Sequence, residues 1–233
     1  MPFHIDSDLI MQAGEVLSSR ERLFWIIGGA GSGKTTVCSI LSERHSLPVY
    51  DMDAHIYGTY HNRFSPDRHP VNTAWSNSEN GLAWLLSMSW DEFNHFNQAA
   101  LPEYLDLLAE DLADMPPDSP LLIDGGITNP AMLAKMLPLR QIACLAVKPG
   151  VNVWESVDRQ EMKEAIFQLP EPERAWRRFL EFNDKINHTI EEECLENNIK
   201  ICRSRLSASV EDLAKDVASL LGLNGMEKSK LTR

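Results

Sequence analysis

The chain contains, at residues 28–35, the stretch Gly28-Gly29-Ala30-Gly31-Ser32-Gly33-Lys34-Thr35. This stretch matches the pattern G-x-x-x-x-G-K-[ST] at every fixed position. The apolar run Leu23–Ile27 precedes it and predicts a strand buried on both faces, and a helical pattern follows from Lys34 to Glu43. Backbone N–H groups of such a glycine-rich turn and the positive end of the following helix dipole both attract anions. The stretch therefore predicts a phosphate-binding loop.

The rest of the chain alternates between predicted strands and predicted helices. Four more apolar runs predict strands at Pro48–Tyr50, Leu121–Ile123, Ile142–Val147 and Ile199–Cys202. Helical patterns cover Asp6–Arg20, about Trp90–Leu112 and about Trp154–Asn197, and further helices begin at Asn129-Pro130 and after the capping residue Ser209. This alternation is typical of an α/β domain with a mostly parallel sheet, in which ligands bind beyond the carboxyl ends of the strands. We expect residues 1–233 to form one such domain.

Composition excludes several classes of protein. The formal net charge of −12 is a poor match for non-specific nucleic-acid binding, which depends on Lys and Arg neutralising phosphates. The first residues lack a basic region followed by an apolar run, and no stretch of about 18 apolar residues appears, so we expect neither a signal peptide nor a membrane span. The four cysteines show no metal-ligand spacing, which predicts buried free thiols in the cytoplasm.

The phosphate-binding loop defines the expected nucleotide site. We expect phosphate contacts from Gly28, Gly29, Ala30, Gly31, Ser32, Gly33, Lys34, Thr35 and Thr36. Lys34 can reach the β- and γ-phosphates of a nucleoside triphosphate, and the Thr35 hydroxyl can bind Mg²⁺. The expected cofactors are therefore ATP and Mg²⁺.

Three acidic residues follow the predicted second and third strands. Asp51 and Asp53 lie at the end of the second strand, where alternation along an extended chain would put both carboxylates on one side. One of them can hold Mg²⁺ through water, and the other can accept the proton of a substrate hydroxyl. Asp124 ends the third strand and is the expected further Mg²⁺ contact, and the two glycines after it leave room for a ligand close to the backbone.

Cations beyond Lys34 would stabilise the charge that spreads over the γ-phosphate oxygens. Residues 150–197 form a candidate lid, and this segment offers Arg159, Arg174, Arg177 and Arg178. We expect at least one of these arginines to act. Arg159 is the first choice because it falls early in the segment, nearest the sheet.

Residues 54–118 are too many for an ordinary loop. They include nine aromatic residues: Tyr57, Tyr60, Phe64, Trp75, Trp84, Trp90, Phe93, Phe96 and Tyr104. We expect a small helical subdomain with its own core, which also forms a mostly apolar acceptor pocket. An anionic group in that pocket could be bound by His61, Arg63, Arg68 and His69.

The phosphate-binding loop, the Asp51-Met52-Asp53 sequence after the second strand and Asp124-Gly125-Gly126 after the third resemble the P-loop kinase group. That group includes shikimate, gluconate and nucleoside-monophosphate kinases, chloramphenicol phosphotransferase and the zeta-toxin kinases. The resemblance implies a P-loop NTPase fold with a five-stranded parallel sheet in the order 2-3-1-4-5, a helical insert after the second strand and a lid after the fourth. By analogy with shikimate kinase, Asp51 would lie near Mg²⁺ and Asp53 near the acceptor hydroxyl. In the zeta-toxin and chloramphenicol enzymes a single acid is the base, so which of the two aspartates acts stays open.

These features predict an ATP- and Mg²⁺-dependent kinase that phosphorylates a hydroxyl of a small-molecule acceptor. One alternative is a nucleotide-dependent regulatory ATPase or switch without an acceptor, although the guanine motif N-K-x-D is absent. A second alternative is a nucleic-acid end kinase, which the acidic composition disfavours. Neither the acceptor nor the oligomeric state can be read from the sequence.

Overall fold

The centre of the molecule is a five-stranded parallel sheet. The computed structural model describes residues 3–147, 153–156, 159–203 and 209–225. The strands are β1 (Leu23–Ile27), β2 (Val49–Asp51), β3 (Leu121–Asp124), β4 (Ile142–Leu145) and β5 (Lys200–Cys202). They lie in the order β2-β3-β1-β4-β5, and every neighbouring pair is parallel. The predicted α/β fold with a five-stranded parallel sheet in the order 2-3-1-4-5 is confirmed.

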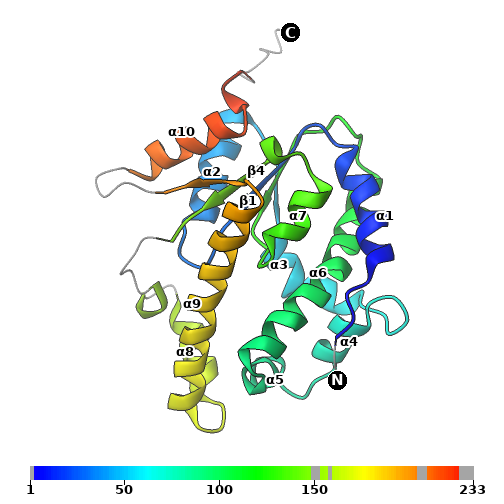
Figure 1. The fold of residues 1–233 in the computed structure, drawn as a ribbon. Helices are drawn as coiled ribbons and strands as arrows, with labels where there is room; N and C mark the ends of the chain where they lie inside the picture. The colour runs from blue at the N-terminus through cyan, green and yellow to red at the C-terminus, as the bar shows by residue number, and fades with distance from the viewer. Residues whose placement is uncertain (1–2, 148–152, 157–158, 204–208, 226–233) are drawn as a thin grey trace.

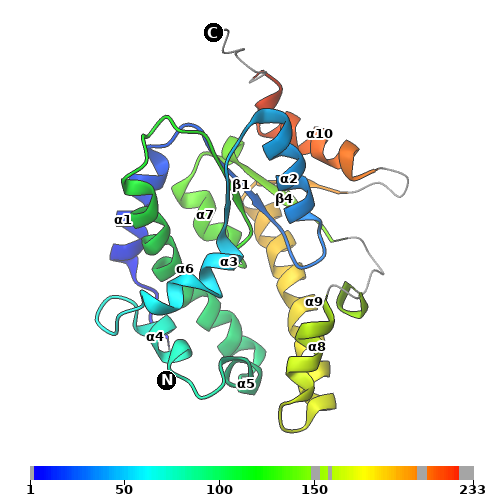
Figure 2. The ribbon, with the colours of Figure 1, turned by 180° about the vertical axis from the view of Figure 1, so that it is seen from behind.

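Helices cover both faces of this sheet (Figures 1 and 2). One face carries α2 (Lys34–His45) and α10 (Val210–Leu220), which begins after a capping box made by Ser209 and Asp212. The other face carries α1 (Ser7–Ser18), α7 (Pro130–Met136) and longer helices described below. All five residues of β1 are buried because alternate side chains enter the two cores. The continuous apolar run in the sequence follows from this two-sided cover.

The segment between β2 and β3 is helical, as expected for residues 54–118. It contains α3 (Met52–Ile56), a short 3₁₀ helix (Thr59–Asn62), α4 (Pro70–Ser76), α5 (Gly81–Ser87) and α6 (Trp90–Ala113). A capping box between Ser89 and Glu92 starts α6. The buried aromatic residues of this segment belong to the same core as one face of the sheet. The expectation of a separate core is therefore wrong, because α6 packs against α1 and the sheet as one body.

The segment between β4 and β5 contains a helical pair. A 3₁₀ turn (Val153–Glu155) leads to α8 (Gln160–Phe167) and α9 (Pro172–Glu196). Of the candidate lid at residues 150–197, residues 150–152 and 157–158 lie outside the described residues. The end of α9 near Glu196 packs at the sheet, while its other end and α8 extend past the sheet on the same side as α5 (Figures 1 and 2).

Two further expectations about the chain can be compared with the structure. All four cysteines are buried and free of disulfides, as predicted: Cys38, Cys144, Cys194 and Cys202. Across the described residues, every helix is too short or too polar to cross a bilayer.

Candidate active site

The predicted phosphate-binding loop connects β1 to α2. Gly28 is required at its start because its φ is +146° and a Cβ there would lie 2.3 Å from the carbonyl oxygen of Leu145. Gly33 precedes α2 with φ +89° and provides no side-chain cap, so the first N–H groups of the helix are left for another acceptor. The Ser32 hydroxyl is buried without a hydrogen-bond partner. A phosphate group suits both features, because it supplies several acceptor oxygens at a helix N-terminus.

The lysine of this loop lies at the end of the loop, where α2 begins. Lys34 is the first residue of α2, and its Nζ donates a 3.4 Å hydrogen bond to the carbonyl oxygen of Gly29. This contact is long for a charged donor. Lys34 also lies close enough to Asp53 and Asp124 to influence the pKa of both carboxyl groups. The ammonium group therefore stands between the loop and the two acids.

A second orphaned polar atom belongs to Asp124. This aspartate is the last residue of β3 and is 3% exposed, and its Oδ1 is buried without a partner. Its side chain is hydrogen-bonded to that of Thr35, and burial raises its pKa while Thr35 and Lys34 oppose that shift. A buried carboxylate oxygen beside a hydroxyl is a donor set that a hard cation such as Mg²⁺ accepts. Thr35 and Asp124 thus fit the predicted metal role.

The described residues alone do not complete a metal site of His, Cys, Asp or Glu side chains. Within the described parts of the chain, no group of three or more His, Cys, Asp or Glu side chains could hold an ion. Mg²⁺ commonly binds through one or two protein ligands together with substrate phosphates and water. A cation held by Thr35 and Asp124 would therefore need the nucleotide for its remaining ligands.

The two aspartates after β2 have different surroundings. Strand β2 ends at Asp51, whose Oδ1 accepts a 2.9 Å hydrogen bond from the N–H of Ala54 and so caps α3. Asp53 lies in the first turn of α3, where its Oδ1 accepts a 3.0 Å hydrogen bond from the N–H of Gly126. The prediction that Asp51 and Asp53 lie on one side of an extended chain is wrong, because the Asp51 cap starts a helix one residue later. Asp51 is exposed, and its partner across the sheet is Asp124.

The Asp53 carboxyl group lines a cavity beside the loop. Its side chain is exposed in area, yet the surrounding protein removes enough water to raise its pKa. Lys34 and the N–H of Gly126 act in the opposite direction, and Asp51 adds to the rise. Asp53 is therefore a carboxyl group whose affinity for a proton exceeds that of an ordinary aspartate.

The turn after β3 is built to bring Asp53 close. The indole N–H of Trp25 donates a 2.9 Å hydrogen bond to the carbonyl oxygen of Gly125, which holds the turn against β1. A Cβ on Gly125 would lie 2.6 Å from Oδ2 of Asp53, and one on Gly126 would lie 2.1 Å from Cγ of Met52. Both glycines also have φ +74°. The room that the glycines were expected to leave for a ligand is taken, at these points, by the side chains of α3.

The cavity has a volume of about 450 Å³. One end is lined by Gly28, Gly29, Ala30 and Lys34 of the loop, together with Asp53 and Arg159. The walls beyond that end come from α4, α5 and α6 on one side and from α8 and α9 on the other. Phosphate loop, carboxylate and guanidinium thus share one continuous space.

Among the four candidate arginines, Arg159 alone lines this cavity. Its guanidinium lies 5.0 Å from the centre of the Trp154 ring. Arg174 pairs with Glu171, and Arg178 donates a hydrogen bond to the carbonyl oxygen of Leu86. Arg177 is exposed.

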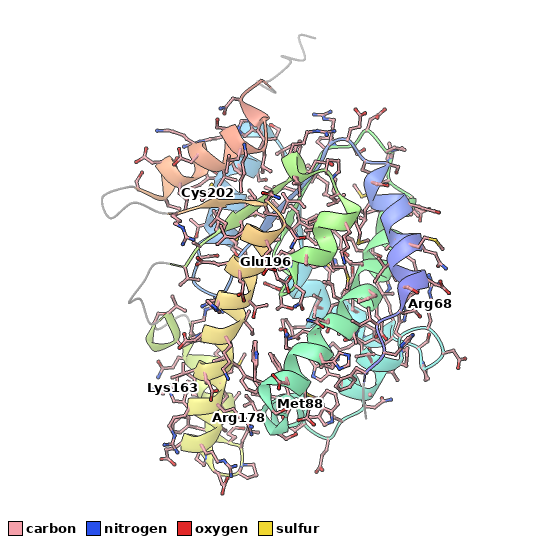
Figure 3. The ribbon with its side chains drawn as sticks, viewed as in Figure 1. Arg68, Met88, Lys163, Arg178, Glu196 and Cys202 are labelled. Atoms are coloured by element: carbon pink, nitrogen blue, oxygen red, sulfur yellow. The ribbon has the colours of Figure 1, made fainter. Side chains whose placement is uncertain are left out.

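The basic residues predicted to bind an anionic acceptor group lie elsewhere. Arg63 forms ion pairs with Asp111 and Glu110. Arg68 forms ion pairs with Asp106 and Glu110, and His69 is hydrogen-bonded to Asp106. None of these three side chains, nor that of His61, lines the cavity as the structure describes it. Figure 3 shows Arg68 at the edge of the molecule beside α1. Acidic residues of α6 already pair with Arg63, Arg68 and His69, so these side chains are not placed to bind an acceptor in this cavity.

Sequence reasoning missed Asn97, a polar residue of the cavity wall. Phe93, Asn97, Leu101 and Tyr104 recur along α6 at intervals of four, four and three residues, so they share one helix face, and all four line the cavity. The spacing was visible in the sequence. An asparagine within an apolar stripe was the signal that this face lines a cavity as well as a core.

Comparison with known proteins gives a fold-level likeness only. No protein-family model matches the chain, and no curated protein sequence is significantly similar to it. Among solved structures, one similar chain is a shikimate kinase from Acinetobacter baumannii in complex with shikimate. The two sequences are 16% identical, the TM-score is 0.43, and the match covers 94% of this chain and 99% of the other.

Proposed function

We propose that this protein is an ATP- and Mg²⁺-dependent phosphotransferase that moves the γ-phosphoryl group to a hydroxyl of a small molecule. One observation carries the proposal: a cavity of about 450 Å³ runs directly from the phosphate-binding loop, past Asp53, into a pocket walled by helices. A nucleotide switch needs the loop but no second pocket beside it. A kinase needs the acceptor hydroxyl and the phosphate in one shared space.

In this proposal Asp53 is the general base and Asp51 is structural. Asp53 accepts the proton of the acceptor hydroxyl, whose oxygen bonds to the γ-phosphorus as the bond to the β–γ bridging oxygen breaks and ADP leaves. The N–H of Gly126 holds the carboxylate in place through one oxygen, which leaves the other oxygen for the proton. Asp51 has its Oδ1 engaged as a helix cap and is not among the residues lining the cavity.

Two cations of the chain would stabilise the transferred group. Lys34 and Arg159 both line the end of the cavity next to Asp53. There they would bind the γ-phosphate oxygens as negative charge spreads over them. Thr35 and Asp124 would hold Mg²⁺, which would supply further neutralisation of phosphate charge.

The test is a paired substitution of the two aspartates. Purified protein would be given γ-labelled ATP and Mg²⁺ with a panel of alcohols, including uncharged aryl alcohols, nucleosides and polyols. Asp53→Asn should lower acceptor phosphorylation by about 10²–10⁴-fold, because the amide keeps the contact with Gly126 but cannot take a proton. Nucleotide affinity should stay nearly unchanged.

Asp51→Asn is the matched control, since an asparagine also caps a helix well. It should retain most of the activity, while Lys34→Ala should abolish transfer and weaken triphosphate binding. Near-normal transfer by Asp53→Asn would refute the base assignment. The whole proposal fails if the wild-type protein binds no nucleoside triphosphate with Mg²⁺ in calorimetry.

A further inference from the structure

The cavity wall away from the phosphate-binding loop is apolar and rich in rings. Trp75, Phe93 and Phe96 line one side, and Phe179 and Phe182 of α9 line the other. Phe93 stacks on Phe182 with ring centroids 4.7 Å apart, so the two sides are in contact. Water against such a wall forms few hydrogen bonds with it, and a ligand with an apolar body gains by replacing that water.

Charged groups are confined to the phosphate end. Among the described residues that line the cavity, Lys34, Asp53 and Arg159 are the charged ones. Arg178 of α9 lies nearby, but it donates to the carbonyl oxygen of Leu86 and its guanidinium lies 5.7 Å from the ring centre of Phe182. A carboxylate or phosphate on the acceptor body would lose its water without gaining a cation. The far wall therefore selects against acidic acceptors.

Among the described residues, polar groups interrupt the apolar wall at several places, and the indole N–H of Trp75 and the amide of Asn97 are buried donors without a hydrogen-bond partner. Asn97 lines the cavity from the middle of α6, and its Nδ2 is buried without a hydrogen-bond partner. A buried amide donor in this state is destabilising unless something in the cavity accepts its proton. Phe93 and Leu101, one turn away on each side, offer no acceptor. An oxygen on a molecule that fills the cavity would supply the missing partner.

We infer that the acceptor is an uncharged alcohol with an apolar, ring-containing body and an oxygen atom that accepts a hydrogen bond from Asn97. The inference rests on the proposed function, because it takes the hydroxyl to lie at Asp53 and the body to lie along the apolar wall. A volume of about 450 Å³ suits a body of two or three rings plus the phosphate group that occupies the other end.

The test compares two probes that differ in one charge. They are methyl 6-(hydroxymethyl)-2-naphthoate and the corresponding acid, 6-(hydroxymethyl)-2-naphthoic acid. Binding would be followed by calorimetry and by quenching of tryptophan fluorescence, with a non-hydrolysable ATP analogue and Mg²⁺ present so that the acid cannot bind at the phosphate end. The ester should bind at least about tenfold more tightly than the acid. Equal affinity, tighter binding of the acid, or no binding of the ester would overturn the inference.

A second comparison tests the oxygen contact. Asn97→Leu keeps the shape of the side chain and removes the donor, so it should weaken ester binding about tenfold. Gln98→Leu, at the adjacent position of α6 and away from the cavity lining, is the matched control and should bind the ester as the wild-type protein does. Unchanged affinity in Asn97→Leu would refute the contact.

The outcomes for the two proposals can be separated. If the ATP analogue does not bind, the proposed function fails, and the same pair of probes in the nucleotide-free protein still measures the preference of the wall. If the analogue binds but the acid is preferred, the phosphotransferase proposal stands and the acceptor class is wrong.

Discussion

Gly29 provides a direct test of how closely α9 packs on the phosphate-binding loop. A Cβ at this position would lie 1.6 Å from Oδ1 and 2.7 Å from Cγ of Asn187, a residue of α9. Gly29 is not among the glycines with positive φ, so alanine suits its backbone. The substitution Gly29→Ala therefore perturbs one contact between loop and helix and little else.

The expected size of the effect follows from these distances. Real Cβ atoms keep at least 3.0 Å from other heavy atoms, so Oδ1 of Asn187 must retreat by about 1.4 Å. Rotation of the short Asn187 side chain moves Cγ over only part of the required distance. The backbone of α9 or of the loop must shift to make up the remaining distance. Overpacking of this kind costs about 1–3 kcal/mol. We expect Gly29→Ala to destabilise the protein by about 2 kcal/mol and to weaken ATP binding about tenfold.

A double-mutant cycle isolates the contact. Asn187→Ala alone should cost less than about 1 kcal/mol, and in the double variant it should recover most of the stability that Gly29→Ala loses. Urea unfolding and calorimetric ATP binding would be measured for all four proteins. Gly14→Ala is the control, because a Cβ there lies 3.7 Å from Met136 and should not clash. Stability of Gly29→Ala equal to wild type, or a loss that Asn187→Ala leaves unrelieved, would show that α9 does not rest on the loop.

Two further predictions concern charge. Glu103 accepts hydrogen bonds from the N–H groups of Val71 and Asn72, and burial raises its pKa to about 7. The pKa of a glutamate in the unfolded chain is about 4.3, so the native state binds the proton more tightly than the unfolded state does. The free energy of unfolding of the wild-type protein should therefore fall by on the order of 3 kcal/mol as pH rises from about 4.5 to 7. Urea unfolding of Glu103→Gln should lack this slope; an identical slope in both proteins would exclude Glu103 as its source. Arg159→Ala should lower the transfer rate about 10²-fold or more in the labelled-ATP assay, while Arg174→Ala should not; equal rates would remove Arg159 from the mechanism.

The elements that the sequence predicts well are those determined by neighbouring residues. Strand β1 covers Leu23–Ile27, the same range as the apolar run, because both of its faces are covered by helices. Helix α2 begins at Lys34 as predicted, directly after the last glycine of the loop. Ser209 starts α10 through a capping box whose two members are three residues apart. Each of these signals is complete within a few positions of the chain.

The sequence is less informative where two local signals compete. Asp51 ends a strand and is also a good helix cap, and alternation along the strand predicts a different place for Asp53 than the cap does. The cap prevails because β2 is only three residues long and Met52 gains a fully buried position as the first residue of α3. The pairing of Asp53 with Gly126, 73 positions away, has no local signal at all.

The distinction between local and long-range signals also separates the two halves of the candidate site. These are the proposed donor half, at the phosphate-binding loop, and the proposed acceptor half, along the apolar wall. In the proposed function phosphate is bound by backbone N–H groups and one lysine from consecutive residues, so the donor half is a motif. The acceptor half is a surface made by side chains from α4, α5, α6, α8 and α9 that meet only after folding. Its basic candidates, Arg63 and Arg68, could be discarded only once their partners on α6 were known. Substitutions along this wall, Asn97 included, should therefore change which alcohol is accepted while leaving the phosphate-binding loop intact. The acceptor half can thus tolerate changes of sequence that the donor half cannot.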